Sequence, residues 1–126
     1  MSLVLLDLDT FKQVNDDYGH ACGDAVLTEV AYALRKQLRS FELLYRLGGD
    51  ELLLVLPGAS FEAAYQLAEQ ARAAIEQCNP VGLSVTASLG VTSAYGRDIE
   101  LDAMYNAADR SLYEAKHGGR NKIGAR

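Results

Sequence analysis

The sequence predicts an α/β fold of the α+β sandwich type, in which a central mixed sheet carries helices on both faces. Within residues 3–8, the odd positions 3 and 5 and the even positions 4, 6 and 8 are apolar, which is typical of a strand covered from both sides. Two further apolar runs flank a Gly-Gly pair, and three longer stretches repeat apolar residues at helical spacing. A chain of 126 residues with 49% apolar content is one domain with its own core.

Three helices are expected from spacing and from capping residues. The first covers residues 25–39, the second follows the N-cap Ser60 and ends before Pro80, and the third covers residues 101–117. Gly118 and Gly119 end the third helix. The inner faces of the first two are expected to be formed by Leu27, Val30, Ala31, Leu34 and Leu38 and by Ala64, Leu67, Ala68, Ala71 and Ile75.

The other strands follow from alternation and from turn residues. Residues 43–45 and 52–56 form a predicted hairpin around Gly48 and Gly49, because glycine accepts the positive φ of a tight turn. Residues 83–91 alternate apolar and small polar side chains, which predicts a half-buried strand. Ile123 is expected in a short last strand.

Composition excludes several classes of protein. A net charge of −5 argues against nucleic acid as a partner, because a duplex-binding surface needs many cations. Two cysteines are too few for a disulfide scaffold, and no Cys/His spacing indicates zinc. No apolar run reaches the roughly 20 residues of a membrane span, and no secretory signal is visible, so we expect a cytoplasmic location.

Two pairs of carboxylates are the candidate chemical groups. Asp50 and Glu51 lie at the tip of the hairpin, and Asp7 and Asp9 end the first strand on one side of it. Adjacent acids repel one another unless a cation binds them, and Mg²⁺ prefers one or two carboxylates with phosphate oxygens. The alternatives are a solvated turn and a strand end that meets water.

Four motifs in order resemble the GGDEF family of diguanylate cyclases. They are Asp7-Leu8-Asp9-Thr10-Phe11-Lys12-Gln13-Val14-Asn15, Gly48-Gly49-Asp50-Glu51-Leu52, Val85-Thr86-Ala87-Ser88-Leu89-Gly90-Val91 and Ala108-Asp109-Arg110-Ser111-Leu112-Tyr113-Glu114-Ala115-Lys116-His117-Gly118-Gly119-Arg120-Asn121. The resemblance implies one GGDEF domain over residues 1–126 with a palm-like, ferredoxin-type nucleotidyl cyclase fold. It also implies an enzyme that condenses two GTP molecules into cyclic di-GMP, with release of pyrophosphate, across a homodimer.

The resemblance also assigns roles to individual residues. It implies that Asp7, Glu51 and the carbonyl of Leu8 bind Mg²⁺ or Mn²⁺, and that Asp50 and Glu51 are catalytic. Asp50 is placed near the attacking 3′-hydroxyl, as a base or as an electrostatic partner. The other implied substrate-binding residues are Asn15 and Asp24 for guanine, and Phe11, Lys12, Lys116 and Arg120 for phosphates.

Simpler interpretations remain for these substrate residues. Asn15 suits an Asx-turn and Asp24 a helix N-cap. Lys116 and Arg120 also complement the carbonyl end of a helix. His20 and His117 are expected at the solvated surface.

The sequence departs from the family pattern at several points. Leu52 replaces the phenylalanine of the family name, and Arg39 with Glu42 stands where many members carry an Arg-x-x-Asp site for cyclic di-GMP feedback, which puts product inhibition in doubt. The connection over residues 78–82 is short. The family's N-terminal helix is absent, so we expect a truncated domain with one face of the first strand uncovered, marginal stability or self-association, and reduced turnover.

The main alternative function is a catalytically inactive GGDEF domain that binds GTP and regulates a neighbouring domain. A weaker one is another nucleotidyl cyclase or palm polymerase, against which the Asn15 and Asp24 pair argues. A sensor or regulatory domain is expected outside this chain.

Overall fold

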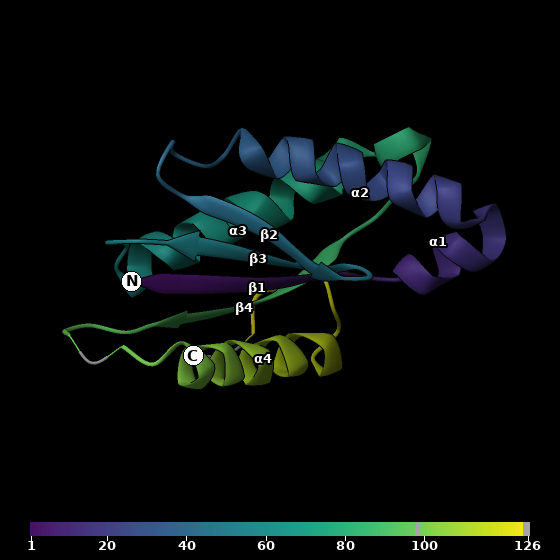
Figure 1. Ribbon diagram of the computed structural model, residues 1–126. Coiled ribbons are helices and arrows are strands. Elements are labelled where there is room, and N and C mark those ends of the chain that lie inside the picture. The colour runs from purple at the N-terminus through teal and green to yellow at the C-terminus, as the bar shows by residue number, and fades with distance from the viewer. Residues whose placement is uncertain (98, 125–126) are drawn as a thin grey trace.

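The computed structural model describes residues 1–97 and 99–124, and it places a four-stranded sheet between helices (Figure 1). The strands are β1 (Ser2–Leu8), β2 (Leu43–Gly48), β3 (Glu51–Leu56) and β4 (Ala87–Ser93). The helices are α1 (Phe11–Tyr18), α2 (His20–Arg35), α3 (Phe61–Cys78) and α4 (Leu101–His117), with a short 3₁₀ turn, η1, at Pro80–Gly82. No helix in the described part of the chain combines the length and the hydropathy that membrane crossing requires.

The sheet order is β2-β3-β1-β4, and neighbouring strands are antiparallel throughout. The expected α+β architecture is confirmed. The prediction of a mixed sheet is wrong, because the paired strands are antiparallel. β1 and β2 run the same way, yet β3 lies between them, so they never pair. Within residues 1–97 and 99–124, the parallel component is one isolated bridge between Leu89 and Ile123, which is all that forms of the expected last strand.

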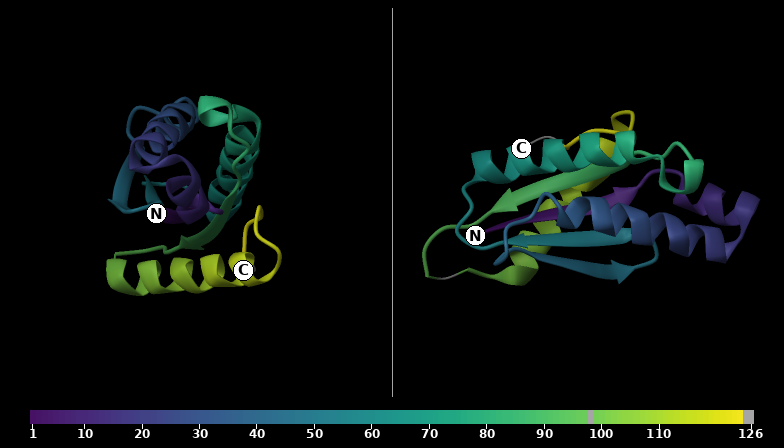
Figure 2. Two further views of the ribbon diagram at one scale, coloured as in Figure 1. Left: turned by 90° about the vertical axis from the view of Figure 1, so that its right-hand side faces the viewer. Right: turned by 90° about the horizontal axis from the view of Figure 1, so that it is seen from above.

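Helices cover the two faces of the sheet unequally. Figure 2 shows α4 alone on one face, while α2 and α3 lie on the other. The main core lies beneath α2 and α3, and a smaller cluster joins Leu5 to Ala108 and Leu112 of α4. Gly90 lets α4 approach β4 closely, because a Cβ there would lie 2.1 Å from the carbonyl oxygen of Ala108.

The first strand is covered on both sides. Leu3 and Leu5, which face α4, are only 3% and 0% exposed. The expectation of an uncovered β1 is therefore wrong, since α4 fills that role. The exposed apolar side chains of the sheet lie instead on the outer strand β2. Leu43, Tyr45 and Leu47 of β2 are 44%, 49% and 47% exposed.

Element boundaries differ from expectation in two places. The helix expected over residues 25–39 is α2, which begins at His20 and ends at Arg35, so Asp24 lies inside it and is not an N-cap. The preceding helix α1 was not predicted. β4 begins at Ala87 rather than at residue 83, and it is not half-buried, because α4 packs on its second face.

The predicted capping and turn residues lie where the helices and the hairpin begin, turn or end. Ser60 caps α3 by accepting a hydrogen bond from the Ala63 amide at 3.1 Å. The hairpin forms around Gly48 and Gly49, and α4 ends immediately before Gly118.

Candidate functional site

A backbone hydrogen bond joins the tip of the β2–β3 hairpin to the end of β1. Gly49 turns the chain with a φ of 45°, in the region that favours glycine. The Arg46 guanidinium donates two hydrogen bonds to the Gly49 carbonyl, at 3.1 and 2.9 Å. The Leu8 amide donates to the carbonyl of Asp50 at 3.3 Å. These bonds hold Asp50 beside the last residues of β1.

Three carboxylates meet at this point. Asp7 and Glu51 are directly opposite in the β1–β3 register, so their Cβ atoms share one face of the sheet at about 5 Å. Burial, followed by hydrogen bonding with Asp7 and the charge of Asp7, raises the pKa of Asp50 to about 7, although the charge of Lys116 opposes the rise. Lys116 forms an ion pair with Asp7.

A hollow of about 280 Å³ opens beside these groups. Its lining brings together six of the residues predicted for metal and phosphate binding, which are Asp7, Leu8, Phe11, Lys12, Lys116 and Arg120. The predicted catalytic residue Asp50 also lines it, together with Thr10, which was not predicted. The Leu8 side chain is buried in the main core, so its backbone is what faces the hollow. Glu51 does not line the hollow but stands next to Asp7.

The first turn of α1 borders the same hollow through Phe11 and Lys12. The first backbone N–H groups of a helix have no partner within it and carry partial positive charge, so they attract anions. Lys12, Lys116 and Arg120 add cations around them. The lining of the hollow therefore combines carboxylates with cationic side chains and the start of a helix.

The predicted guanine residues lie apart from the hollow, on α1 and α2. Asn15 packs against Gly23, and its Oδ1 is buried without a hydrogen-bond partner. Asp24, the next residue after Gly23, is exposed to solvent. A buried acceptor without a donor costs about 1–3 kcal/mol.

Asp9 has a role that the sequence did not reveal. It is only 3% exposed and does not line the hollow. Its carboxylate accepts hydrogen bonds from the hydroxyls of Thr86 and Ser88, both at 2.7 Å. It also accepts one from the backbone N–H of Asn121 at 2.9 Å. The prediction that Asp7 and Asp9 form one acidic pair is therefore wrong. Asp9 fastens the C-terminal segment to the end of β1.

The segment that follows α4 is held from a second side. Arg120 and Asn121 both have positive φ, 63° and 47°, which is uncommon outside glycine. The guanidinium of Arg72 donates to Oδ1 of Asn121 at 2.9 Å. The side-chain nitrogen Nδ2 of Asn121 donates in turn to Oε2 of Glu76. Arg120 also lies 3.9 Å from Asp9. α3 and Asp9 together thus fix the backbone that presents Arg120 to the hollow.

Glu51 also has a partner that the sequence did not indicate. The hydroxyl of Tyr105, on α4, donates to Oε1 of Glu51 at 2.7 Å. This bond, followed by burial and the charge of Glu51, raises the pKa of Tyr105 to about 12. Nothing in the local sequence indicated what the hydroxyl of Tyr105 would reach.

The donor set fits a hard divalent cation. Carboxylate and carbonyl oxygens are what Mg²⁺ and Mn²⁺ prefer, and Mg²⁺ usually completes its shell with water and substrate phosphate. No group of three or more His, Cys, Asp or Glu residues that could hold a metal ion occurs within residues 1–97 and 99–124.

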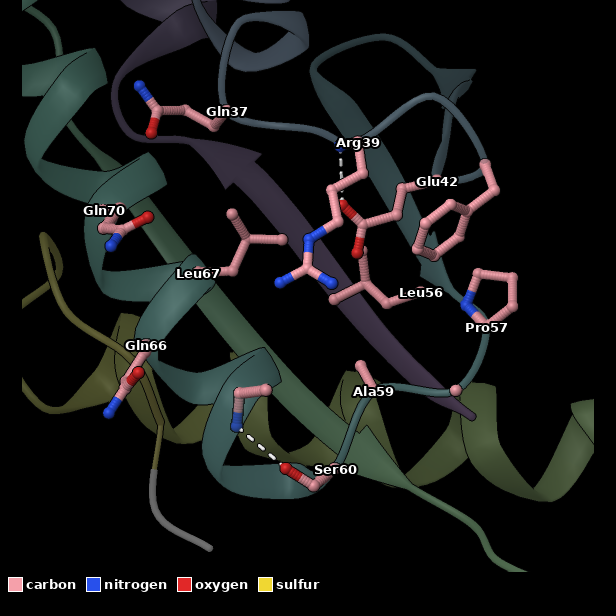
Figure 3. A pocket seen from close by; sticks show the side chains of 13 residues that line it. Gln37, Arg39, Glu42, Leu56, Pro57, Ala59, Ser60, Gln66, Leu67 and Gln70 are labelled. Atoms are coloured by element: carbon pink, nitrogen blue, oxygen red, sulfur yellow. Dashed lines mark hydrogen bonds between the residues drawn. The ribbon is translucent and has the colours of Figure 1, made fainter.

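Arg39 and Glu42 lie elsewhere, in a cavity of about 800 Å³ between the α2–β2 connection and the start of α3 (Figure 3). Oε1 of Glu42 accepts a hydrogen bond from the Arg39 amide at 2.7 Å. The guanidinium of Arg39 is directed into the cavity, between Glu42 and Leu67. His20 and His117 are exposed as predicted, and the ring of His117 stacks on Tyr113.

Comparison with known proteins gives one consistent family. A family model described as diguanylate cyclase, GGDEF domain, matches residues 1–122. The chain is 43% identical to "Diguanylate cyclase DgcP" of Pseudomonas aeruginosa over 125 residues, which is 96% of this chain and 18% of that protein. It is 38% identical to "Diguanylate cyclase A" of Treponema denticola over 128 residues, 98% of this chain and 34% of that protein. It thus spans only part of these relatives.

Solved structures agree. The active GGEEF domain of a diguanylate cyclase from Vibrio cholerae superposes with a TM-score of 0.89 at 32% identity, over 96% of this chain and 79% of that one. The GGDEF domain of DgcB from Caulobacter crescentus, in complex with c-di-GMP, gives a TM-score of 0.86 at 27% identity, over 98% and 76%.

Proposed function

This chain belongs to the GGDEF domain family, and we propose that it is the catalytic domain of a diguanylate cyclase. In this proposal the domain condenses two GTP molecules into cyclic di-GMP and releases two pyrophosphates. The observation that carries the proposal is the single hollow lined by Asp7, Asp50, Lys116 and Arg120 and bordered by the start of α1. It offers acids for a cation and cations for a triphosphate.

Asp7, Glu51 and the Leu8 carbonyl are the residues we assign to Mg²⁺ or Mn²⁺. A divalent cation would neutralise the triphosphate and stabilise the charge that develops at the reacting phosphorus. Lys12, Lys116, Arg120 and the N-terminal amides of α1 would hold the phosphate oxygens. Asp50 would lie nearest the attacking hydroxyl, and a pKa of about 7 suits a group that accepts a proton near neutral pH.

Guanine would bind at Asn15 and Asp24. The unpartnered Oδ1 of Asn15 supports this assignment, because it is an acceptor that lacks a donor. Asp24 offers a second, exposed acceptor for the N–H groups of the base. Adenine lacks a donor at N1, so we expect GTP to bind more tightly than ATP in a competition titration. Equal affinities would rule out the assignment.

Condensation requires two nucleotides, so the proposal includes a homodimer in which each domain presents one GTP to the other. A regulatory or sensor domain elsewhere in the protein, and a cytoplasmic location where GTP is available, belong to the same proposal. The alternative is a domain that binds GTP without turnover and regulates a neighbour. The presence of both acids and of the phosphate cations favours the enzyme.

One incubation separates these functions. The protein is mixed with GTP and Mg²⁺, and the products are resolved by chromatography. A cyclic dinucleotide, lost in Glu51→Gln, supports the enzyme. GTP binding without product supports the regulatory module, and wild-type turnover in Glu51→Gln would overturn the metal assignment.

Feedback by the product is proposed at the cavity of Arg39. The guanidinium directed into that cavity supports it, because arginine can bind a phosphate in a bidentate manner. Glu42 binds the backbone of its own turn, so we expect weak binding of cyclic di-GMP. Calorimetry with cyclic di-GMP on the parent and on Arg39→Ala tests this. Tight binding that Arg39→Ala abolishes would show that Glu42 does not weaken the site.

A further inference from the structure

Tyr105 connects the helix α4 to one of the proposed metal-binding acids. Its ring packs beside the cluster of Leu5, Ala108 and Leu112, so the position of the ring is set by the core between α4 and β1. From there its hydroxyl reaches Oε1 of Glu51, 2.7 Å away on β3. A half-buried side chain therefore makes a hydrogen bond to the carboxylate that stands opposite Asp7 in the sheet.

The chemistry of this bond is directional. An ionised carboxylate only accepts hydrogen bonds, so the tyrosine must donate. The bond occupies one oxygen of Glu51 and leaves the other oxygen available. Tyrosine has few rotatable bonds, and its polar end usually finds a partner when the ring is buried. The Glu51 carboxylate is thus held in one orientation before any ligand arrives.

We propose that Tyr105 is a positioning residue that holds the Glu51 carboxylate in the orientation in which it receives a divalent cation. The inference rests on the proposed function, because it takes Glu51 as a metal ligand. Outer partners of this kind fix the orientation of metal-binding side chains, and their loss typically weakens metal binding 10- to 100-fold. Tyr105 would act through Glu51 and would not touch substrate.

The chain supplies a matched control on the same helix. Tyr113 is 61% exposed, and its ring stacks on His117. Tyr105→Phe and Tyr113→Phe each remove one hydroxyl and keep the ring. Because Tyr105→Phe keeps its ring packed against the core, the variant should still fold, and a thermal melt checks this.

The test measures Mn²⁺ binding, by electron paramagnetic resonance of the free ion, in the presence of a GTP analogue with a methylene group between the α and β phosphorus atoms. We expect Tyr105→Phe to weaken Mn²⁺ binding about 10-fold, while Tyr113→Phe matches the parent. In a Glu51→Gln background the same change should have no further effect, because the two residues act as a unit.

Three results would overturn the inference. If Tyr105→Phe bound Mn²⁺ as the parent does, the hydroxyl would have no positioning role. An equal loss in the Glu51→Gln background would mean that Tyr105 acts by another route. If the parent itself bound no Mn²⁺ with the analogue, the metal site of the proposed function would fail together with this inference, and that result is distinguishable from the other two.

Discussion

The side-chain oxygen of Asn15 occupies the space that a β-carbon on residue 23 would need. A Cβ built on Gly23 would lie 1.9 Å from Oδ1 of Asn15 and 3.2 Å from the ring of Phe11. Glycine at this point of α2 is therefore what lets α1 place the Asn15 amide between the two helices.

We expect Gly23→Ala to separate binding from stability. The new methyl group meets mainly the flexible end of Asn15, which can rotate away, so the fold survives. Alanine also favours a helix over glycine by about 1 kcal/mol, which offsets the crowding. GTP affinity should fall about 10-fold, corresponding to the loss of a hydrogen bond of about 1.4 kcal/mol. Thermal melts and GTP titrations test both parts, and unchanged GTP affinity would contradict the role of Asn15.

Asp50 should make stability fall as the pH rises. Its pKa is raised from 3.8 to about 7 in the folded protein, so the unfolded chain releases its proton first. Folding is thereby penalised from about pH 4 upward, and the penalty is complete above about pH 7. Asp50→Asn removes it. In metal-free buffer, this variant should be about 1 kcal/mol more stable than the parent at pH 8, after allowance for solvent screening, and should gain less at pH 5.

Urea unfolding at the two pH values measures this difference. Asp16→Asn is the control, because Asp16 is exposed on α1. A gain from Asp50→Asn that was equal at pH 5 and pH 8, or that Asp16→Asn reproduced, would show that Asp50 titrates normally.

Asp9→Asn should destabilise the protein and loosen Arg120. The amide keeps the size of the carboxylate but loses its charge, and it replaces one acceptor oxygen with a donor. Hydrogen bonds to charged groups are worth about 1.5–3 kcal/mol each, so we expect a loss of about 3 kcal/mol in the free energy of unfolding. A loss below 0.5 kcal/mol in urea unfolding would mean that the C-terminal segment is held by α3 alone.

Gly90→Ala should disrupt the contact between α4 and β4. The added methyl group would meet backbone atoms of α4, including the Leu112 nitrogen at 2.5 Å, and backbone cannot rotate aside as a side chain can. Overpacking of this kind typically costs about 1–3 kcal/mol. Urea unfolding should show that loss, with lower GTP affinity because α4 carries Lys116. Unchanged stability would mean that α4 shifts freely along the sheet.

Sequence patterns predicted the parts of the fold that depend on local spacing. The apolar spacing and the Ser60 cap gave α3, and the Gly-Gly pair gave the hairpin that brings Glu51 beside Asp7. The start of α2 was missed because Gly23, which lies in its first turns, is a poor helix former, and packing of the helix overrides that propensity.

The remaining parts of the site depend on contacts between residues far apart in the sequence. Asp9 turns toward Asn121, which is 112 residues away, and Tyr105 reaches Glu51 across 54 residues. No local pattern encodes either contact. Likewise, the burial of both faces of β4 depends on how closely α4 approaches Gly90, which only the assembled fold determines.

The exposed outer strand has a consequence for how the domain behaves at high concentration. Leu43, Tyr45 and Leu47 lie on β2, which is the end strand of the sheet, so its outer backbone edge has no neighbouring strand in the described part of the chain. An apolar end strand is a template for pairing between molecules. Colloidal stability in solution should therefore depend on this edge more than on the acidic surface, and a single lysine at position 45 would be the simplest way to improve it.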